Sequence, residues 1–302
     1  MDIINFGNEL KNDVEKSLGE GFNITLQEVI KNNGIIHNAM TIRQEGSNVA
    51  PSIYYDEFFD LYEKGEPFGK LTQAVLELYR ESRLDGKVNF DFFKDFDMAC
   101  SLLSYKLALA EPNRERLRDV PVRYIEDLVM IPICIVTIKG NESGSVTITR
   151  DHLKMWEISE EELWENIMDN TTVVFPASVK GITEYLRMPF LPVSDILDDV
   201  YVVTTESGYQ GAGAVLYPGV LRKIAEKVGE DLFVIPSSVH ETIVMPALKC
   251  QIPPECIRQM IGEVNTSVIR DEEVLSPSLY YYSLQRDELK IWDLDLKLAS
   301  NT

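Results

Sequence analysis

The sequence predicts an α+β protein with mixed, mostly antiparallel sheets and packed helices, and three observations support this class. The chain has 302 residues, of which 45% are hydrophobic and 26% charged, so it can bury a sizeable core. Short apolar runs are separated by turn residues such as Asn33-Gly34, which is a strong hairpin signal. Elsewhere, apolar residues recur at helical spacing behind capping residues. Neighbouring hairpins imply antiparallel pairing.

The N-terminal part, residues 1–125, is predicted to form one α+β domain from a hairpin and helices. Residues 9–18 have the spacing of a short amphipathic helix, and residues 24–30 and 35–42 have the pattern of two strands. Pro67 opens a longer predicted helix with its apolar residues on one face. We expect this helix and a shorter one before it to cover the hairpin.

Residues 126–292 are predicted to form a second α+β domain with a duplicated strand-strand-helix-strand unit, followed by a tail over 293–302. The two units end alike, in VFPASVK (174–180) and VIPSSVH (234–240). Proline donates no backbone hydrogen bond, so both prolines are predicted where a strand leaves its sheet. The predicted strands are 128–138, 145–149 and 172–175 in the first unit, and 200–205, 212–216 and 232–235 in the second.

Helices in this half have recognisable start and stop signals. Ser159 followed by Glu162 is a capping box, which predicts a helix from residue 160. Pro218 and Gly229 bracket another predicted helix. A last helix is predicted after Pro254, with Ile257, Met260, Ile261 and Val264 on its inward face.

The charge balance excludes several kinds of partner. The chain has 29 basic and 49 acidic residues, a net charge of -20, which repels phosphate backbones, so we expect no direct nucleic-acid partner. No apolar run approaches the roughly 20 residues of a membrane-spanning helix, and the first residues lack the pattern of a signal peptide. We therefore expect a cytoplasmic protein with no membrane partner.

The motifs predict neither a metal site nor a cofactor. Cysteines stand at positions 100, 134, 250 and 256 without a C-x-x-C pair and are interpreted as reduced core thiols. The glycines of GYQGAG (208–213) do not have the dinucleotide-binding spacing, so the segment is interpreted as a hairpin turn followed by a strand.

His240 and Glu241 form the best candidate catalytic pair, with Ser238 as a neighbouring candidate. A histidine beside a carboxylate can perform acid–base chemistry near neutral pH. The structural alternative is a polar strand start after Pro236, where neighbouring side chains would point to opposite faces. A functional His240 must be partly exposed and hydrogen-bonded to Ser238, Glu241 or a group from 176–180.

Acidic and aromatic residues are concentrated in the second half. Acidic clusters occupy 157–165, 195–199 and 271–273, and they form either solvated faces or a docking surface. Tyr280, Tyr281 and Tyr282 are consecutive, so in a strand at least one ring is expected to be exposed and available for a partner.

Five segments carry a resemblance to a known family: KNNG (31–34), NVAPSIY (48–54), LYPGVL (216–221), IPSSVHE (235–241) and EEVLS (272–276). Together they resemble an uncharacterised bacterial family catalogued as a domain of unknown function and common among gut anaerobes. The resemblance extends over about residues 20–292. It implies a bacterial cytoplasmic protein and supplies no activity, cofactor or catalytic residue.

These observations favour a non-enzymatic, cytoplasmic protein-binding or regulatory protein with an acidic surface. One alternative is an acidic fold that mimics nucleic-acid phosphates and inhibits a basic protein. The other is a hydrolase or transferase with a site at the 237–241 loop, facing residues 177–180. A deep pocket containing His240 would favour the enzyme, whereas carboxylates gathered on one exposed face would favour binding.

Overall fold

The structure is a computed structural model that describes residues 1–83, 89–139, 142–187, 199–249 and 251–293. The chain divides into two compact units: unit 1 comprises Met1–Phe92 with Thr137–Gly144, and unit 2 comprises Phe93–Val136 with Ser145–Thr302. Cys250 and parts of the predicted turn 139–144, the acidic cluster 195–199 and the tail 293–302 lie outside the described residues. The predicted α+β class with mostly antiparallel sheets is confirmed.

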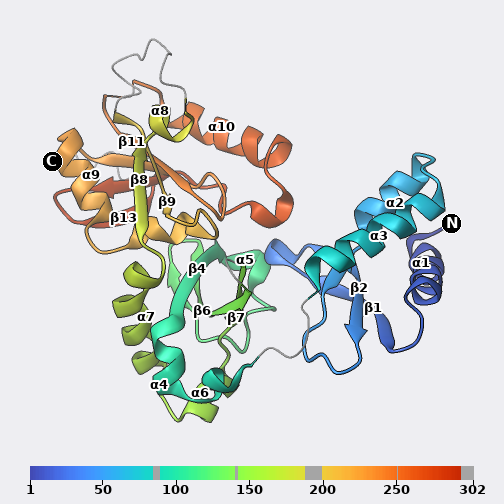
Figure 1. Cartoon of the computed structure of the whole chain (residues 1–302). Helices are drawn as coiled ribbons and strands as arrows, with labels where there is room; N and C mark the ends of the chain where they lie inside the picture. Colours follow the sequence, from blue (N-terminus) through green and yellow to red (C-terminus); the bar gives the residue numbers. More distant parts are fainter. Residues whose placement is uncertain (84–88, 140–141, 188–198, 250, 294–302) are drawn as a thin grey trace. The chain divides into compact units, whose positions relative to one another are not determined.

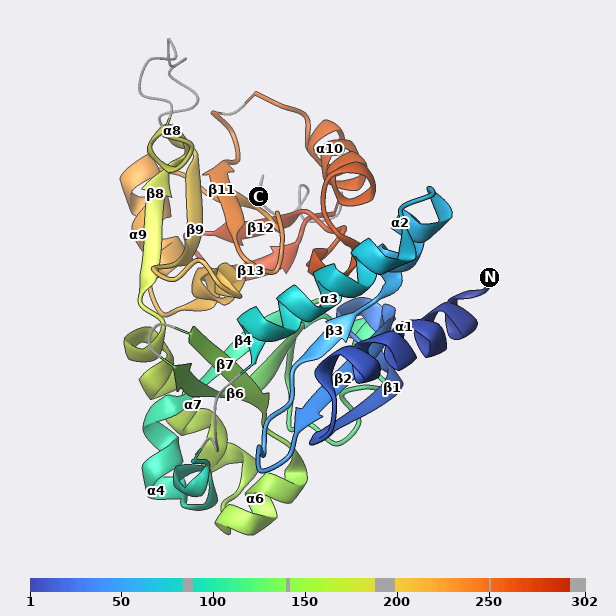
Figure 2. The same cartoon turned by 45° about the vertical axis from the view of Figure 1, so that its right-hand side comes forward.

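Unit 1 contains a three-stranded antiparallel sheet in the order β1-β2-β3 (Figures 1 and 2). The first two strands pair without interruption from Phe22 opposite Gln44 to Ile30 opposite Ile36, which confirms the predicted hairpin. The elements are α1 (Ile3–Leu18), β1 (Phe22–Ile30), β2 (Ile36–Gln44), β3 (Ser52–Tyr54), α2 (Asp56–Glu63) and α3 (Phe68–Ser82).

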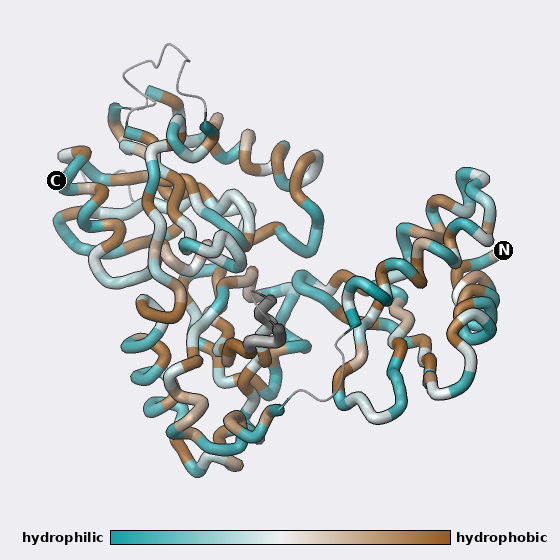
Figure 3. Tube along the Cα trace, in the orientation of Figure 1, coloured by the Kyte–Doolittle hydropathy of each residue, from teal (hydrophilic) through white to brown (hydrophobic). Residues whose placement is uncertain are grey.

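The helices of unit 1 pack on one face of this sheet. Asp2 caps α1 by accepting a hydrogen bond from the Asn5 amide, and the helix ends at Gly19, whose φ is 78°. Polar and apolar residues alternate along α1–α3, as Figure 3 shows. One core cluster collects the apolar faces: Phe6, Leu10 and Val14 of α1, Leu71, Val75, Leu76 and Tyr79 of α3, and Ile24, Met40 and Ile42 of the hairpin.

A second sheet has the order β4-β6-β5, with β7 also paired to β6. The strand β4 precedes residue 125 and β6 follows it, and the two strands pair with each other. The predicted domain boundary at residue 125 therefore falls within unit 2. Trp164 of the neighbouring helix α7 is buried, and its indole N–H donates to the Pro121 carbonyl at 2.9 Å. The elements are β4 (Leu103–Leu109), β5 (Arg123–Ile125), β6 (Leu128–Lys139), β7 (Glu142–Thr147), and helices α4 (Phe96–Ala99), α5 (Ala110–Asn113), α6 (Arg150–Trp156) and α7 (Glu160–Val174).

The largest sheet has six strands in the order β13-β12-β10-β11-β9-β8, with antiparallel neighbours throughout. Helix α10 covers one face, where Ile257 and Ile261 pack with Phe233 and Met245. Met260 is 55% exposed and Val264 is 38% exposed, so the predicted inward positions of these two residues are wrong. The elements are β8 (Ala177–Gly181), α8 (Ile182–Tyr185), β9 (Tyr201–Thr205), α9 (Val220–Val228), β10 (Leu232–Ile235), β11 (Thr242–Pro246), α10 (Pro254–Ser267), β12 (Tyr280–Ser283) and β13 (Glu288–Ile291).

The predicted duplication of a strand-strand-helix-strand unit is wrong in two of its strands. Residues 172–174 form the end of α7, although 232–235 form the strand β10, so the two matched segments are not equivalent. Residues 212–216 lie in the 3₁₀-helix η5 (Gly211–Leu216) instead of a strand. Pro236 does follow the end of β10, but Pro176 lies between α7 and β8. Residues 174–180 and 234–240 therefore have similar sequences but different secondary structures.

Candidate functional site

The predicted site loop, residues 237–241, connects β10 to β11 in the six-stranded sheet. Two backbone hydrogen bonds hold it in place: the Ala212 amide donates to the Val239 carbonyl at 3.2 Å, and the Val239 amide donates to the Glu273 carbonyl at 2.9 Å. The loop is therefore anchored on one side to η5 and on the other to the segment after α10.

The polar side chains of the loop bind one another. The Ser238 hydroxyl donates to Glu241 Oε1 at 3.1 Å, and the Ser237 hydroxyl donates to the same oxygen at 3.3 Å. Ser238 is 4% exposed, and its Oγ also accepts the His240 amide at 3.0 Å. The loop thus forms a local turn in which Glu241 and Ser238 satisfy buried donors.

The His240 ring is partly exposed and is held by two other segments. Its Nδ1 accepts the Gln210 amide at 3.1 Å, and its Nε2 lies 3.7 Å from Glu273 Oε1. A backbone N–H can only donate, so Nδ1 carries no proton and the neutral ring carries its proton on Nε2, toward Glu273. The Tyr209 ring lies beside it, with centroids 6.0 Å apart.

Gly211 lets the backbone of η5 approach this loop closely. A Cβ atom at this position would lie 2.2 Å from Thr204 Oγ1 and 2.7 Å from both the His240 carbonyl oxygen and the Thr205 amide nitrogen. The Thr204 hydroxyl in turn donates to the His240 carbonyl at 2.7 Å. The loop conformation therefore depends on a residue without a side chain at position 211.

This arrangement supplies an oriented histidine and a carboxylate but not an activated nucleophile. A hydroxyl has one proton, and that of Ser238 is directed to Glu241 and not to the His240 ring. Strand β9 lies between β8 and β11 in the sheet, so residues 177–180 belong to a strand that is not the neighbour of β11. The ring of His240 thus has its partners outside the 237–241 loop, and a catalytic role for His240, Glu241 and Ser238 stays a prediction.

Replacing His240 with alanine tests the structural interpretation of this loop. We expect the free energy of unfolding to fall by about 1 kcal/mol, because the Gln210 amide loses its acceptor. Binding to any partner should be unchanged. Thermal unfolding and a binding assay should be run together on the variant and the wild type. Unchanged stability with lost binding or activity would make this loop the functional site.

The three consecutive tyrosines of β12 each donate their hydroxyl to a carboxylate. Tyr280 binds Asp127, Tyr281 binds Asp231 at 2.5 Å, and Tyr282 binds Asp287. Burial and, next, the bound carboxylates raise the pKa of all three hydroxyls, that of Tyr282 to about 12. Tyr280 and Tyr282 are buried and Tyr281 is partly buried, so the prediction that at least one ring is exposed is wrong, and all three hydroxyls are bound within the chain.

Asp127 connects the second sheet to the segment that leads into β12. Its Oδ2 accepts the hydroxyls of Ser276 at 2.7 Å and Ser278 at 2.8 Å, and its Oδ1 accepts the Tyr280 hydroxyl. Next to it, Glu126 accepts the Ile291 amide at 3.2 Å through Oε2. The turn formed by Glu126 and Asp127, just before β6, thus holds both strands of the C-terminal hairpin, β12 and β13.

A pocket of about 420 Å³ opens in unit 2 between this hairpin and the loop before α10. Its aromatic side chains make edge contacts: the Phe233 ring lies 6.0 Å from the Tyr281 ring and 6.5 Å from the Trp292 ring. Phe233 and Trp292 are buried. The complete lining is Phe233, Ala247, Leu248, Gln251, Ile252, Pro253, Pro254, Glu255, Tyr281 and Trp292. We call this recess the aromatic pocket.

Two adjacent acidic residues after α9 hold opposite walls of the aromatic pocket. Glu230 Oε1 accepts the amides of Leu248 at 3.0 Å and Lys249 at 2.9 Å, which fixes the loop wall. Asp231 accepts the Tyr281 hydroxyl and the Leu284 amide, which fixes the hairpin wall. The pocket is therefore preformed by hydrogen bonds at its edges. Sequence reasoning missed it because its walls come from separate segments; Pro253-Pro254 was the sole local signal.

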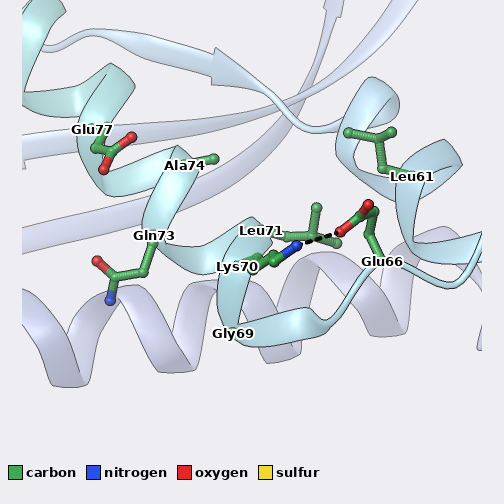
Figure 4. Close-up of a pocket in the computed structure, with 8 residues that line it drawn as sticks. All are labelled: Leu61, Glu66, Gly69, Lys70, Leu71, Gln73, Ala74 and Glu77. Atoms are coloured by element: carbon green, nitrogen blue, oxygen red, sulfur yellow. Dashed lines mark hydrogen bonds and ion pairs between the residues drawn. The ribbon is translucent and has the colours of Figure 1, made fainter.

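A second recess, of about 550 Å³, lies on unit 1 between α2 and α3 (Figure 4). Figure 4 shows Lys70 reaching Glu66, and their charged atoms are 3.4 Å apart. Gln73 and Glu77 extend from the next turns of α3 and are exposed, as are Glu66 and Lys70. This recess is a shallow, solvated groove, whereas the aromatic pocket has a buried base.

The cysteines of the described chain are all unpaired: Cys134 is buried, Cys100 is partly buried and Cys256 is exposed. Burial raises the pKa of the Cys134 thiol to about 12, so it is unreactive near neutral pH. The interpretation of Cys256 as a core thiol is wrong, because it lies on the outer side of the first turn of α10.

Metal-binding clusters and membrane-spanning helices are absent from the described residues. No group of three or more His, Cys, Asp and Glu side chains is placed there to hold a metal ion. None of the described helices combines the length and the apolar character needed to cross a membrane.

The fold and its recesses define an α+β protein of two compact units, with an aromatic pocket in the second. The chain belongs to the family of unknown function DUF5688, whose family model matches residues 3–284. This confirms the resemblance to an uncharacterised family. No curated protein matches the chain, and no solved structure matches it.

Proposed function

We propose that this protein is a non-enzymatic binding protein whose aromatic pocket receives an aromatic or branched aliphatic side chain from a basic segment of a partner protein. The observation that carries the proposal is the lining of the pocket: three aromatic side chains and two prolines, with Glu255 as its one charged residue. Apolar recesses of 300–1,000 Å³ with few polar groups are typical ligand sites.

The exposed apolar residues around the mouth of the aromatic pocket favour a protein as the partner. Leu248 is 78% exposed and Ile252 is 37% exposed, so apolar surface continues outward from the pocket. A buried aromatic base beneath exposed aliphatic side chains can receive one anchoring side chain and cover the contact from water.

The negative charge around the pocket and on the whole chain favours a partner segment that is basic. Glu255 lines the pocket, and Glu230 and Asp231 form its supports. The nearby cations are Arg286, which acts on Tyr281, and Lys249, which is paired with Asp199, so negative charge is in excess there. The whole chain has a net charge of -20, which favours encounter with a cationic segment and disfavours an acidic one.

A defined peptide tests the proposal. A fluorescein-labelled peptide with one tryptophan flanked by two lysines on each side is titrated with the full chain, and binding is read by fluorescence anisotropy. We expect saturable binding that weakens when tryptophan is replaced by alanine, when lysines are replaced by glutamates, and when salt is raised.

Paired variants locate the site. Ile252→Lys places a positive charge in the pocket wall, which opposes both an apolar anchor and a basic segment, and should weaken binding at least tenfold, about 1.4 kcal/mol. Met260→Lys places the same charge on the exposed face of α10, outside the lining, and should leave binding unchanged. Equal binding of the tryptophan and alanine peptides would contradict the proposal.

A further inference from the structure

We infer that β1 is a docking edge through which two copies of this chain pair as an antiparallel dimer. In the part of the chain that the structure describes, β2 is the one strand that pairs with β1, and β1 forms the edge of its sheet over nine residues, Phe22–Ile30. An edge of this length presents a row of backbone donors and acceptors to another strand.

The hydrogen bonds at both ends of the hairpin show which backbone groups face outward. The Lys31 amide donates to the Ile35 carbonyl at 2.7 Å, and the Glu45 amide donates to the Gly21 carbonyl at 2.8 Å. Antiparallel pairing alternates, so odd-numbered residues of β1 bond to β2. The N–H and C=O groups of the even-numbered residues point away from the sheet: Phe22, Ile24, Leu26, Glu28 and Ile30.

These outward groups fit a second copy of themselves. With a two-fold axis at Leu26, Leu26 faces Leu26, Ile24 faces Glu28, and Phe22 faces Ile30. Each facing pair consists of two even-numbered residues, so one register satisfies all of the outward groups of both strands. The axis also covers Ile30, which is 57% exposed, with Phe22 of the other copy.

The charged residues near β1 are compatible with this register. The strand also lacks the features that usually prevent an edge strand from pairing with another chain. Glu28 is the one charged residue of β1, and it faces Ile24 instead of another carboxylate. Beyond the strand, the same register places Lys31 of one copy opposite Gly21 of the other, which is next in sequence to Glu20. The strand contains no proline or lysine, and its pairing to β2 has no bulge.

The mass of the full chain in solution tests the inference. Sedimentation velocity in 0.15 M salt should show a species of twice the 34.4 kDa chain mass that dissociates on dilution. Glu28→Pro removes an outward donor and should weaken dimerisation at least tenfold, since proline is tolerated where an edge N–H faces solvent. Glu28→Ala removes the same charge and keeps the N–H, so it should remain a dimer.

Amide hydrogen exchange gives a second readout that needs no variant. The odd-numbered amides of β1 should be protected at every protein concentration, and the amides of Ile24, Leu26 and Glu28 should gain protection only as concentration rises. A monomer at all concentrations, or a dimer that Glu28→Pro leaves intact with unprotected even-numbered amides, overturns the inference.

Discussion

Replacing Asp127 with alanine is expected to lower the free energy of unfolding by about 4 kcal/mol, because three hydroxyl donors lose one charged acceptor. Hydrogen bonds to a charged group contribute about 1.5–3 kcal/mol each, and their effects are not additive. Ser276 is fully buried, so water cannot replace the lost partner without local opening. Urea unfolding followed by tryptophan fluorescence measures the change.

The control for Asp127 is Tyr280→Phe, which removes one of the three donors and keeps the carboxylate. We expect this variant to lose about 1.5 kcal/mol. A loss below 1 kcal/mol for Asp127→Ala would mean that the carboxylate does not hold the hairpin, and that apolar packing of β12 is sufficient.

Replacing Gly211 with alanine is expected to lower the free energy of unfolding by about 3 kcal/mol. The new methyl group would lie 2.7 Å from two backbone atoms, so η5 and the 237–241 loop must separate. We expect the thermal midpoint to fall and the hydrogen bond from Gln210 to His240 to be lost. In NMR spectra, the ring signals of His240 would shift.

Gly262→Ala is the matched control for Gly211. A Cβ atom at Gly262 meets no heavy atom within 4 Å, and the residue lies inside α10. Alanine favours helix over glycine by up to about 1 kcal/mol, so this variant should be as stable as the wild type or more stable. If both alanine variants behaved alike, close packing at position 211 would not be important.

Local sequence signals predicted the elements that depend on neighbouring residues. Asn33-Gly34 marks the hairpin turn, where Asn33 has a φ of 59°. Ser159 caps α7 by accepting the Glu162 amide at 3.1 Å. In each case, the residues that determine the structure are within a few positions of one another, so no tertiary information is needed.

The two wrong strand predictions have tertiary causes. Residues 172–175 are rich in β-branched side chains, but α7 continues through Thr171, whose hydroxyl lies 2.5 Å from that of Ser104 on β4. Residues 212–216 have an apolar pattern typical of a strand, but Gly211 and Gly213 allow a tight 3₁₀-helix against the Tyr105 ring. Contacts distant in sequence decided both segments.

Residues 237–241 do form a loop between β10 and β11, but the contacts of this loop could not be predicted from the sequence. The partners of the His240 ring are Gln210 and Glu273, which come from different parts of unit 2. The aromatic pocket has the same difficulty, since Phe233 and Trp292 meet only after the six-stranded sheet forms. A single sequence shows which side chains could take part in chemistry. Which of them lie next to one another depends on the order of the strands in the sheet.

The exposed thiol of Cys256 offers an attachment point for a fluorescent reporter near the aromatic pocket. Cys256 directly follows Glu255 of the pocket lining, and the buried Cys134 is closed to alkylating dyes. With Cys100 and Cys250 changed to serine, an environment-sensitive fluorophore would attach at one position beside the pocket mouth. Its emission would then respond to whatever enters, so a panel of ligands could be screened without labelling any of them.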